Sequence, residues 1–193
     1  MSTGLRERKK LKTRAAIQKE ALRLFAEKGY EETTIEEIAA AVEISPSTFF
    51  NYFPSKEAVV FQDDLDPLIF AAFNAQPADV GPITALRNAM RTVFSGIPPD
   101  VRAMMQTRTA LVLASPELRA ATLNQFAELV DQFADLLGNR VGRSSTDFAV
   151  RNMAGALLGV MMASYFAAAA DPHADLTEVI DKSMAHLEAG LPL

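Results

Sequence analysis

The chain has no cysteine and no tryptophan among its 193 residues, and it has only two histidines. The absence of cysteine excludes disulfide bonds, thiolate nucleophiles and metal sites with cysteine ligands. No stretch alternates apolar and polar residues with a period of two, so β-structure is not expected. Hydrophobic residues make up 49% of the chain and charged residues 22%. This composition is typical of a globular protein.

Charge is distributed unevenly along the chain, whose net charge is −5. Residues 61–193 carry 9 basic and 15 acidic side chains, whereas residues 1–14, here called the basic arm, hold six basic residues against the single acid Glu7. The six are Arg6, Arg8, Lys9, Lys10, Lys12 and Arg14. Because phosphate binding depends on local positive charge, a basic arm on an acidic body is compatible with DNA. A solvated, frayed terminus is the alternative.

The basic arm has no apolar core segment, so we do not expect a secretory signal and we expect a cytoplasmic protein. From Arg8 onward, apolar residues recur at helical spacing. This first predicted helix stops at Gly29, a residue type that often takes the left-handed position closing a helix. A second helix is predicted to begin at Thr34, where Glu37 completes a capping box.

Two further helix starts are marked by serine. Ser45 is the predicted N-cap of a third helix with Pro46 as its first residue, and this helix must be over by Phe53 because proline follows. Ser55 caps a fourth helix, and the predicted apolar stripe of this helix consists of Val59, Val60, Leu68, Ile69 and Phe73. Residues that break helices separate five more segments, which are predicted near 83–96, 100–113, 116–138, 145–170 and 175–189.

The second and third predicted helices have the spacing of a helix-turn-helix, in which the second helix enters the major groove of DNA. Phe49 and Phe53 are predicted to face inward. Hydroxyl and amide groups on the opposite edge can bond phosphates or base edges, and the N–H groups at a helix start favour a phosphate oxygen. A helical hairpin that only packs is the alternative. The polar edge consists of Ser45, Ser47, Thr48, Asn51 and Tyr52.

The stretch Thr33–Lys56, TTIEEIAAAVEISPSTFFNYFPSK, resembles the DNA-binding domain of the TetR family of bacterial repressors. The shared features are paired threonines, an Ile–Ala pair, Ile44–Ser45, an aromatic pair, Tyr–Phe and a lysine after the serine. The resemblance implies phosphate contacts by Thr34, Tyr52 and Lys56, and base contacts by Ser47, Thr48 and Asn51. The predicted DNA-binding residues are Arg14, Thr34, Ser45, Pro46, Ser47, Thr48, Asn51, Tyr52 and Lys56.

Three positions depart from the pattern of that family. Glu43 stands where a glycine is common, and Ser47 also replaces a frequent glycine, which makes the base-reading edge bulkier. Phe50 stands where a tyrosine is usual, so a hydroxyl contact is lost there.

The segment 110–121, ALVLASPELRAA, resembles the C-terminal body of regulators related to the mycofactocin-cluster repressors. That resemblance implies a lipid-like acyl-CoA ligand. Methionine and phenylalanine fit irregular apolar ligands, although plain core is the alternative for each of them. Arg108 lies in an otherwise apolar helix and is predicted to hold a ligand carboxylate or phosphate, with an ion pair to Glu128 or Asp131 as the alternative. The predicted ligand-binding residues are Met104, Arg108, Phe126, Phe133 and Met161.

Residues 152–170 carry no charge and include Gly155 and Gly159 at a G-x-x-x-G spacing. A membrane span is one interpretation, but alanine and glycine make up about half of the run and no basic cluster anchors it. Small residues also let helices approach closely in soluble dimers. Together with the apolar stripe of Val179, Ile180, Met184 and Leu187, this predicts a symmetric interface.

The sequence therefore predicts an all-α protein with a three-helix helix-turn-helix domain at 1–55 and a larger helical ligand-binding and dimerisation domain at 56–193. Its expected function is that of a homodimeric repressor of a palindromic operator, released by a small hydrophobic effector. An enzyme is the rival, but His173 and His186 lie near no nucleophile motif. No metal or cofactor site is predicted. A nucleoid protein would need basic charge spread over the body, which is acidic.

Overall fold

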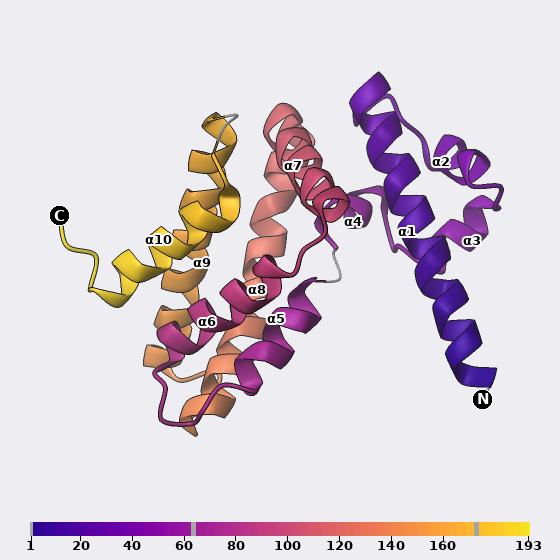
Figure 1. Cartoon of the computed structure of the whole chain (residues 1–193). Helices are drawn as coiled ribbons and strands as arrows, with labels where there is room; N and C mark the ends of the chain where they lie inside the picture. Colours follow the sequence, from indigo (N-terminus) through magenta and orange to yellow (C-terminus); the bar gives the residue numbers. More distant parts are fainter. Residues whose placement is uncertain (1, 63–64, 172–173) are drawn as a thin grey trace. The chain divides into compact units, whose positions relative to one another are not determined.

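The computed structural model describes residues 2–62, 65–171 and 174–193. Over these ranges it is built of helices and has no strand (Figure 1), which confirms the predicted all-α class. The helices are α1 (Ser2–Lys28), α2 (Ile35–Ala41), α3 (Pro46–Phe50), α4 (Lys56–Phe61), α5 (Leu65–Asn74), α6 (Pro82–Ser95), α7 (Pro99–Ala114), α8 (Pro116–Val141), α9 (Phe148–Ala170) and α10 (Leu176–Glu188).

At Gly29, Thr34 and Ser45 the helix ends in the structure coincide with the caps predicted from the sequence. The hydroxyl of Thr34 accepts the N–H of Glu37, whose carboxylate accepts the N–H of Thr34 in return. Ser45 caps α3 with its hydroxyl, and Gly29 closes α1 with φ +91°. These signals are local, because each cap satisfies backbone groups only a few residues away.

The predicted fourth helix is wrong as a single element, since the structure divides it into α4 and α5. Gln62 follows α4 in an extended conformation, with φ −78° and ψ 126°. Pro67 lies in the first turn of α5, where a proline is tolerated, whereas it cannot continue a preceding helix. Of the predicted stripe, Val59, Val60, Ile69 and Phe73 are buried, whereas Leu68 is 54% exposed.

The chain folds into two compact units. The first consists of residues 1–63 and 100–121, and the second of residues 64–99 and 122–193. The chain thus passes between the units three times. The division into 1–55 and 56–193 is drawn by function rather than by compactness, and it stays a prediction.

One hydrophobic core holds the first unit together. Phe25 of α1 and Phe49 of α3 are almost completely buried in it, as is Phe53, which follows α3. Leu111 and Leu118, from the end of α7 and the start of α8, belong to the same core. The segment 100–121 is therefore part of the unit that contains the helix-turn-helix.

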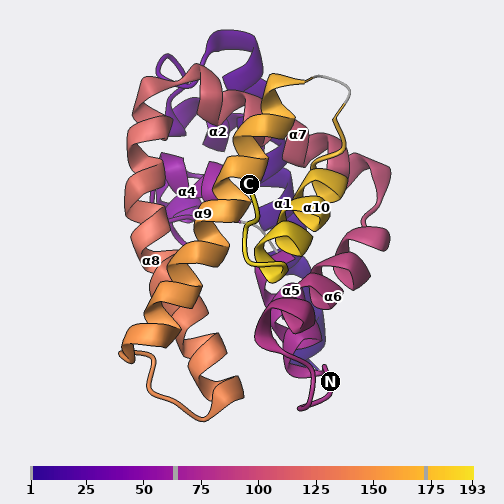
Figure 2. The ribbon, with the colours of Figure 1, turned by 90° about the vertical axis from the view of Figure 1, so that its left-hand side faces the viewer.

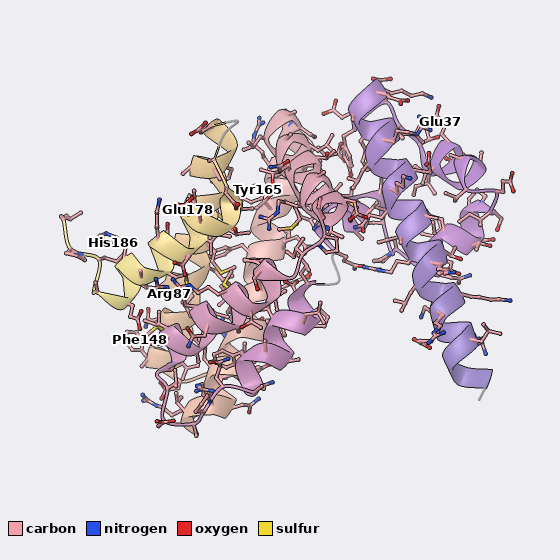
Figure 3. All side chains as sticks on the ribbon, viewed as in Figure 1. Glu37, Arg87, Phe148, Tyr165, Glu178 and His186 are labelled. Carbon is pink, nitrogen blue, oxygen red and sulfur yellow. The ribbon has the colours of Figure 1, made fainter. Side chains whose placement is uncertain are left out.

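In the second unit, α10 packs against α6 and α9, and Figure 2 shows α9 and α10 side by side. Arg87 of α6, labelled in Figure 3, holds Asp181 of α10 with two bonds, Nε to Oδ1 at 2.8 Å and Nη2 to Oδ2 at 3.1 Å. This guanidinium keeps the pKa of Asp181 below its usual range. Ile180 and Met184 are buried inside the chain, so their predicted use in a symmetric interface is wrong.

The small-residue face of α9 is open. A Cβ built on Gly155 or Gly159 would meet no atom within 4 Å. Phe148, at the start of the same helix, is 84% exposed (Figure 3). None of the helices in the described ranges combines the length and apolar character that a membrane crossing requires.

Candidate nucleic-acid interface

Helix α3 is only five residues long, so its shape depends on its caps and on packing rather than on its own propensity. Ser45 caps its start, and Pro46 supplies a preset φ at the first helical position. Phe49 anchors its inner side in the core, with Phe53 one turn later. The ring centroids of these two residues lie 5.9 Å apart. The opposite side of α3 is left for solvent or a partner.

A cluster of hydroxyl groups marks the start of α3. The Oγ of Ser45 lies 2.8 Å from the Oγ of Ser47 and 2.8 Å from the Oγ1 of Thr48. Ser45, Pro46 and Ser47 are exposed, and Thr48 is half-buried. Since a hydroxyl both donates and accepts, this cluster can match either kind of group on a base edge or a phosphate.

The far end of α3 presents an amide and an aromatic ring. Asn51 ends the helix and is exposed, whereas Tyr52 is half-buried against the core. Phe50 is 51% exposed and packs its ring edgewise against Phe49. The structure thus brings Ser45, Ser47, Thr48 and Asn51 onto one short helix, as the sequence predicts.

The turn before α3 requires an unusual backbone conformation at Glu43. Its N–H donates to the carbonyl of Ala40, and the N–H of Ile44 donates to the carbonyl of Ala39 at 2.9 Å. These two bonds form the Schellman motif, whose left-handed residue is usually glycine. Glu43 occupies it with φ 55°, which gives a physical reason for the glycine that the resemblance leads one to expect there.

Thr34, a predicted phosphate ligand, is exposed at the start of α2. Its partner in the capping box, Glu37, is also bonded to Lys28, with 2.6 Å between Nζ and Oε1. This bond lowers the pKa of Glu37 below its usual range. Glu37 (Figure 3) therefore stays ionised and keeps the end of α1 next to the start of α2.

Lys56 is bound within the first unit. Its Nζ donates to the carbonyl of Tyr30 at 2.9 Å and to that of Thr33 at 3.2 Å, and it lies 4.2 Å from the centre of the Tyr30 ring. An ammonium group has three N–H donors, so the two bonds leave room for a phosphate oxygen. Lys56 therefore holds the turn between α1 and α2, and its contact with a phosphate stays a prediction.

Arg14 reaches the end of α3 rather than standing apart in the basic arm. Its Nη1 donates to the carbonyl of Tyr52 at 3.3 Å and to Oε1 of Gln62 at 3.4 Å, and its Cζ lies 4.5 Å from the centre of the Phe53 ring. One turn further along α1, Gln18 is 6% exposed and donates from Nε2 to the carbonyls of Val59 at 2.9 Å and Gln62 at 2.8 Å.

The sequence analysis did not single out Gln18 or Gln62. The burial of Gln18 could have been predicted, because it lies four residues before Leu22 and seven before Phe25 and so shares their buried face. No comparable signal marks Gln62.

The predicted ligand residues divide between the two units. Met104 and Arg108 belong to the first unit, where Met104 packs against the core and Arg108 donates from Nη1 to the carbonyl of Gln62 at 3.3 Å. The other three, Phe126, Phe133 and Met161, belong to the second unit.

We expect Glu43→Gly to raise the free energy of unfolding by about 0.5–1 kcal/mol, because glycine adopts the left-handed conformation without a steric cost. Glu43→Ala is the matched control, since it removes the carboxylate but keeps the strained conformation, and it should leave stability within about 0.5 kcal/mol. Urea denaturation measures both. Equal stabilisation by the two variants would show that charge, rather than backbone strain, is the cause.

Comparison with known proteins gives two matches to family profiles. Residues 17–62 match the N-terminal domain described as bacterial regulatory proteins, tetR family, and residues 80–192 match the MftR C-terminal domain. The regulator TcmR of Streptomyces glaucescens is 36% identical over 146 residues, which are 72% of this chain and 65% of TcmR. MftR of Mycobacterium tuberculosis, whose name links it to mycofactocin biosynthesis, is 28% identical over 89% of this chain and 87% of MftR.

Solved structures agree with these matches. FadR of Thermus thermophilus, a TetR-family repressor solved in complex with lauroyl-CoA, is 28% identical with a TM-score of 0.58 over 93% of this chain and 95% of FadR. NalD of Pseudomonas aeruginosa, at 19% identity and a TM-score of 0.60 over 94% of this chain and 97% of NalD, shares the fold. With both parts of the chain matched, and with the capped helix-turn-helix in place, this protein belongs to the TetR family of bacterial transcriptional regulators and has a C-terminal domain of the MftR type.

Proposed function

We propose that the protein is a homodimeric repressor that binds a near-palindromic operator in the cytoplasm and is released by a small hydrophobic effector of the acyl-CoA class. The observation that carries the DNA-binding part is α3, whose inner face is fixed by Phe49 while Ser47, Thr48 and Asn51 lie on its outer side. In a dimer, two such helices would read half-sites about one helical turn, roughly 34–36 Å, apart.

Phosphate contacts would fix the position of α3 on the duplex. We assign them to Thr34, Tyr52, Lys56 and the basic residues of α1. The basic arm is helical from Ser2, and its charged side chains other than half-buried Arg14 are exposed, which favours a surface that follows the DNA backbone over a frayed terminus. Arg14, anchored at the end of α3, would connect the two groups of contacts.

An enzymatic role has little support, because the family consists of transcriptional regulators. His186 is exposed on α10, and His173 lies outside the described residues.

The assignment of base and phosphate contacts predicts different effects for two variants. Thr48→Ala should mainly relax the preference at one or two base pairs, at a cost of about 1–3 kcal/mol each. Lys56→Ala should weaken binding to all sequences. It should also reduce the slope of log affinity against log salt concentration by about one. Gel-shift titrations at several salt concentrations, with an operator selected from random duplexes and with mismatched sites, separate the two.

Thr48→Ser, which keeps the hydroxyl, serves as the control for the first variant. Because Lys56 also holds the turn after α1, a thermal melt must show that Lys56→Ala is folded under the assay conditions. If neither Thr48→Ala nor Lys56→Ala changes affinity for any duplex, α3 is not the helix that reads DNA.

The proposed dimer interface is the open, uncharged face of α9. Glycine and alanine let a second helix approach closely, and the face carries exposed Phe148 and Phe166 at its two ends. Since Ile180 and Met184 are buried within the chain, α10 would support α9 from behind.

We expect Gly159→Leu to give a monomer, because a leucine side chain on this face would hold the two copies of α9 apart. Sedimentation at micromolar concentration measures the change, and operator affinity should fall with it because one half-site offers too few contacts. Gly4→Leu is the matched control, since Gly4 also lies in a helix with open space around it. A Gly159→Leu protein that stays dimeric would place the interface elsewhere.

The effector class is supported by the complex of FadR with lauroyl-CoA and by the apolar side chains of the second unit. Phe133 is buried and its ring packs edgewise on that of Phe70, with 5.7 Å between the centroids. We assign the contacts with an acyl tail to Phe126, Phe133 and Met161 of the second unit. The ligand-binding roles expected of Met104 and Arg108, which belong to the first unit, remain separate predictions. Burial of a long tail at about 25 cal/mol per Å² supplies micromolar affinity after the cost of association.

Acyl-CoAs should release the protein from its operator, with a potency that rises with chain length because each buried methylene adds about 0.8 kcal/mol. Fluorescence anisotropy of a labelled operator measures the release, and free coenzyme A is the control without a tail. Release that does not depend on chain length, or release by small polar molecules, would exclude the lipid-like effector and leave the operator-binding function untouched.

A further inference from the structure

The carbonyl oxygen of Gln62 is a junction of hydrogen bonds from two helices. Gln18 of α1 donates to it from Nε2 at 2.8 Å, and Arg108 of α7 donates from Nη1 at 3.3 Å. A carbonyl oxygen has two lone pairs, so it can accept both donors at once. The end of α4 is thus held by side chains of two other helices of the first unit.

The same residue continues the connection through its side chain. Oε1 of Gln62 accepts Nη1 of Arg14, which also donates to the carbonyl of Tyr52 directly after α3. The guanidinium of Arg14 lies against the ring of Phe53. A continuous chain of contacts therefore runs from Arg108 on α7 through Gln62 and Arg14 to the end of α3.

Arg108 is 7% exposed, and its bond to the carbonyl of Gln62 is partly buried, although Gln62 itself is exposed. A carbonyl at the end of a helix has no intrahelical partner, so Gln18 and Arg108 supply donors that α4 itself does not. Gln62 is also the last described residue before the chain leaves the first unit, and α7 begins where the chain returns to it.

We propose that Arg108 is a positioning residue for DNA recognition, which sets the orientation of α3 through Gln62 and Arg14 instead of touching DNA. The proposal rests on the operator-binding function proposed above. Arg108 then has a role even in the absence of an effector. A head group that bound the guanidinium would draw Arg108 away from Gln62.

The test compares effector-free affinities of the full chain for two duplexes, the selected operator and a scrambled sequence of the same length. Arg108→Met, which keeps an apolar stem, should weaken operator binding about five- to tenfold, the net size of one ordinary hydrogen bond. Binding to the scrambled duplex should change less than about twofold, because it depends on phosphate contacts alone. Arg108→Lys, whose ammonium can still donate to Gln62, should keep most of the operator affinity.

Arg119→Met is the matched control, because it removes one guanidinium from the same segment, where Arg119 donates to the carbonyl of Leu113, and it should bind both duplexes like the wild type. Adding Arg108→Met to Arg14→Met should cost little further operator affinity, since the chain is already broken. If Arg108→Met does not fold, Gln18→Met tests the same junction and should show the same selective loss.

Two results would overturn the proposal. One is operator affinity in Arg108→Met equal to that of the wild type, which is what a residue that only holds an effector would give. The other is an equal loss on both duplexes, or full additivity with Arg14→Met. A wild-type protein that selects no operator would instead contradict the proposed function itself, so the two failures are distinguishable.

Discussion

A helix of five residues cannot hold its shape or its direction in water. The caps, the entry turn and the core contacts of the first unit supply the support that α3 lacks. Isolated helices shorter than about 12–15 residues are marginal, so α3 is stabilised by its surroundings. Ser45 and Pro46 start it, the Schellman turn at Glu43 sets its entry, and Phe49 and Phe53 attach it to the core. The side chains on its outer face are therefore presented on a rigid base, which favours selective binding because little ordering is left to be done on association.

The parts of the structure that the sequence predicts well are those decided by neighbours in the chain. The capping box of Thr34 and Glu37, the N-cap at Ser45 and the left-handed Gly29 involve groups within a few residues of one another. The departure at Glu43 belongs to the same class, since a single φ angle explains it. The polar edge of α3 could be predicted for this reason too.

Other features depend on partners far along the chain, and these the sequence does not reveal. The break at Gln62 follows an apolar stripe that continues on both sides of it, so periodicity alone favours one helix. Arg108 has the pattern of an embedded ligand arginine, yet it donates a hydrogen bond to a carbonyl 46 residues away. The stripe of α10 has the pattern of an interface, but α6 and α9 of the same chain cover Ile180 and Met184. An amphipathic face predicts that the face is buried, but it does not identify the partner that covers it.

The account depends most directly on α3 reading DNA as one of a symmetric pair. In vitro selection of the full-length protein on random duplexes measures this without knowledge of the natural operator. The account predicts enrichment of an inverted repeat whose half-site centres lie about one helical turn apart. It also predicts that sequence selectivity is lost in Thr48→Ala at one or two positions of each half-site. Recovery of no sequence preference, or of a single unrepeated site bound by a monomer, would contradict it.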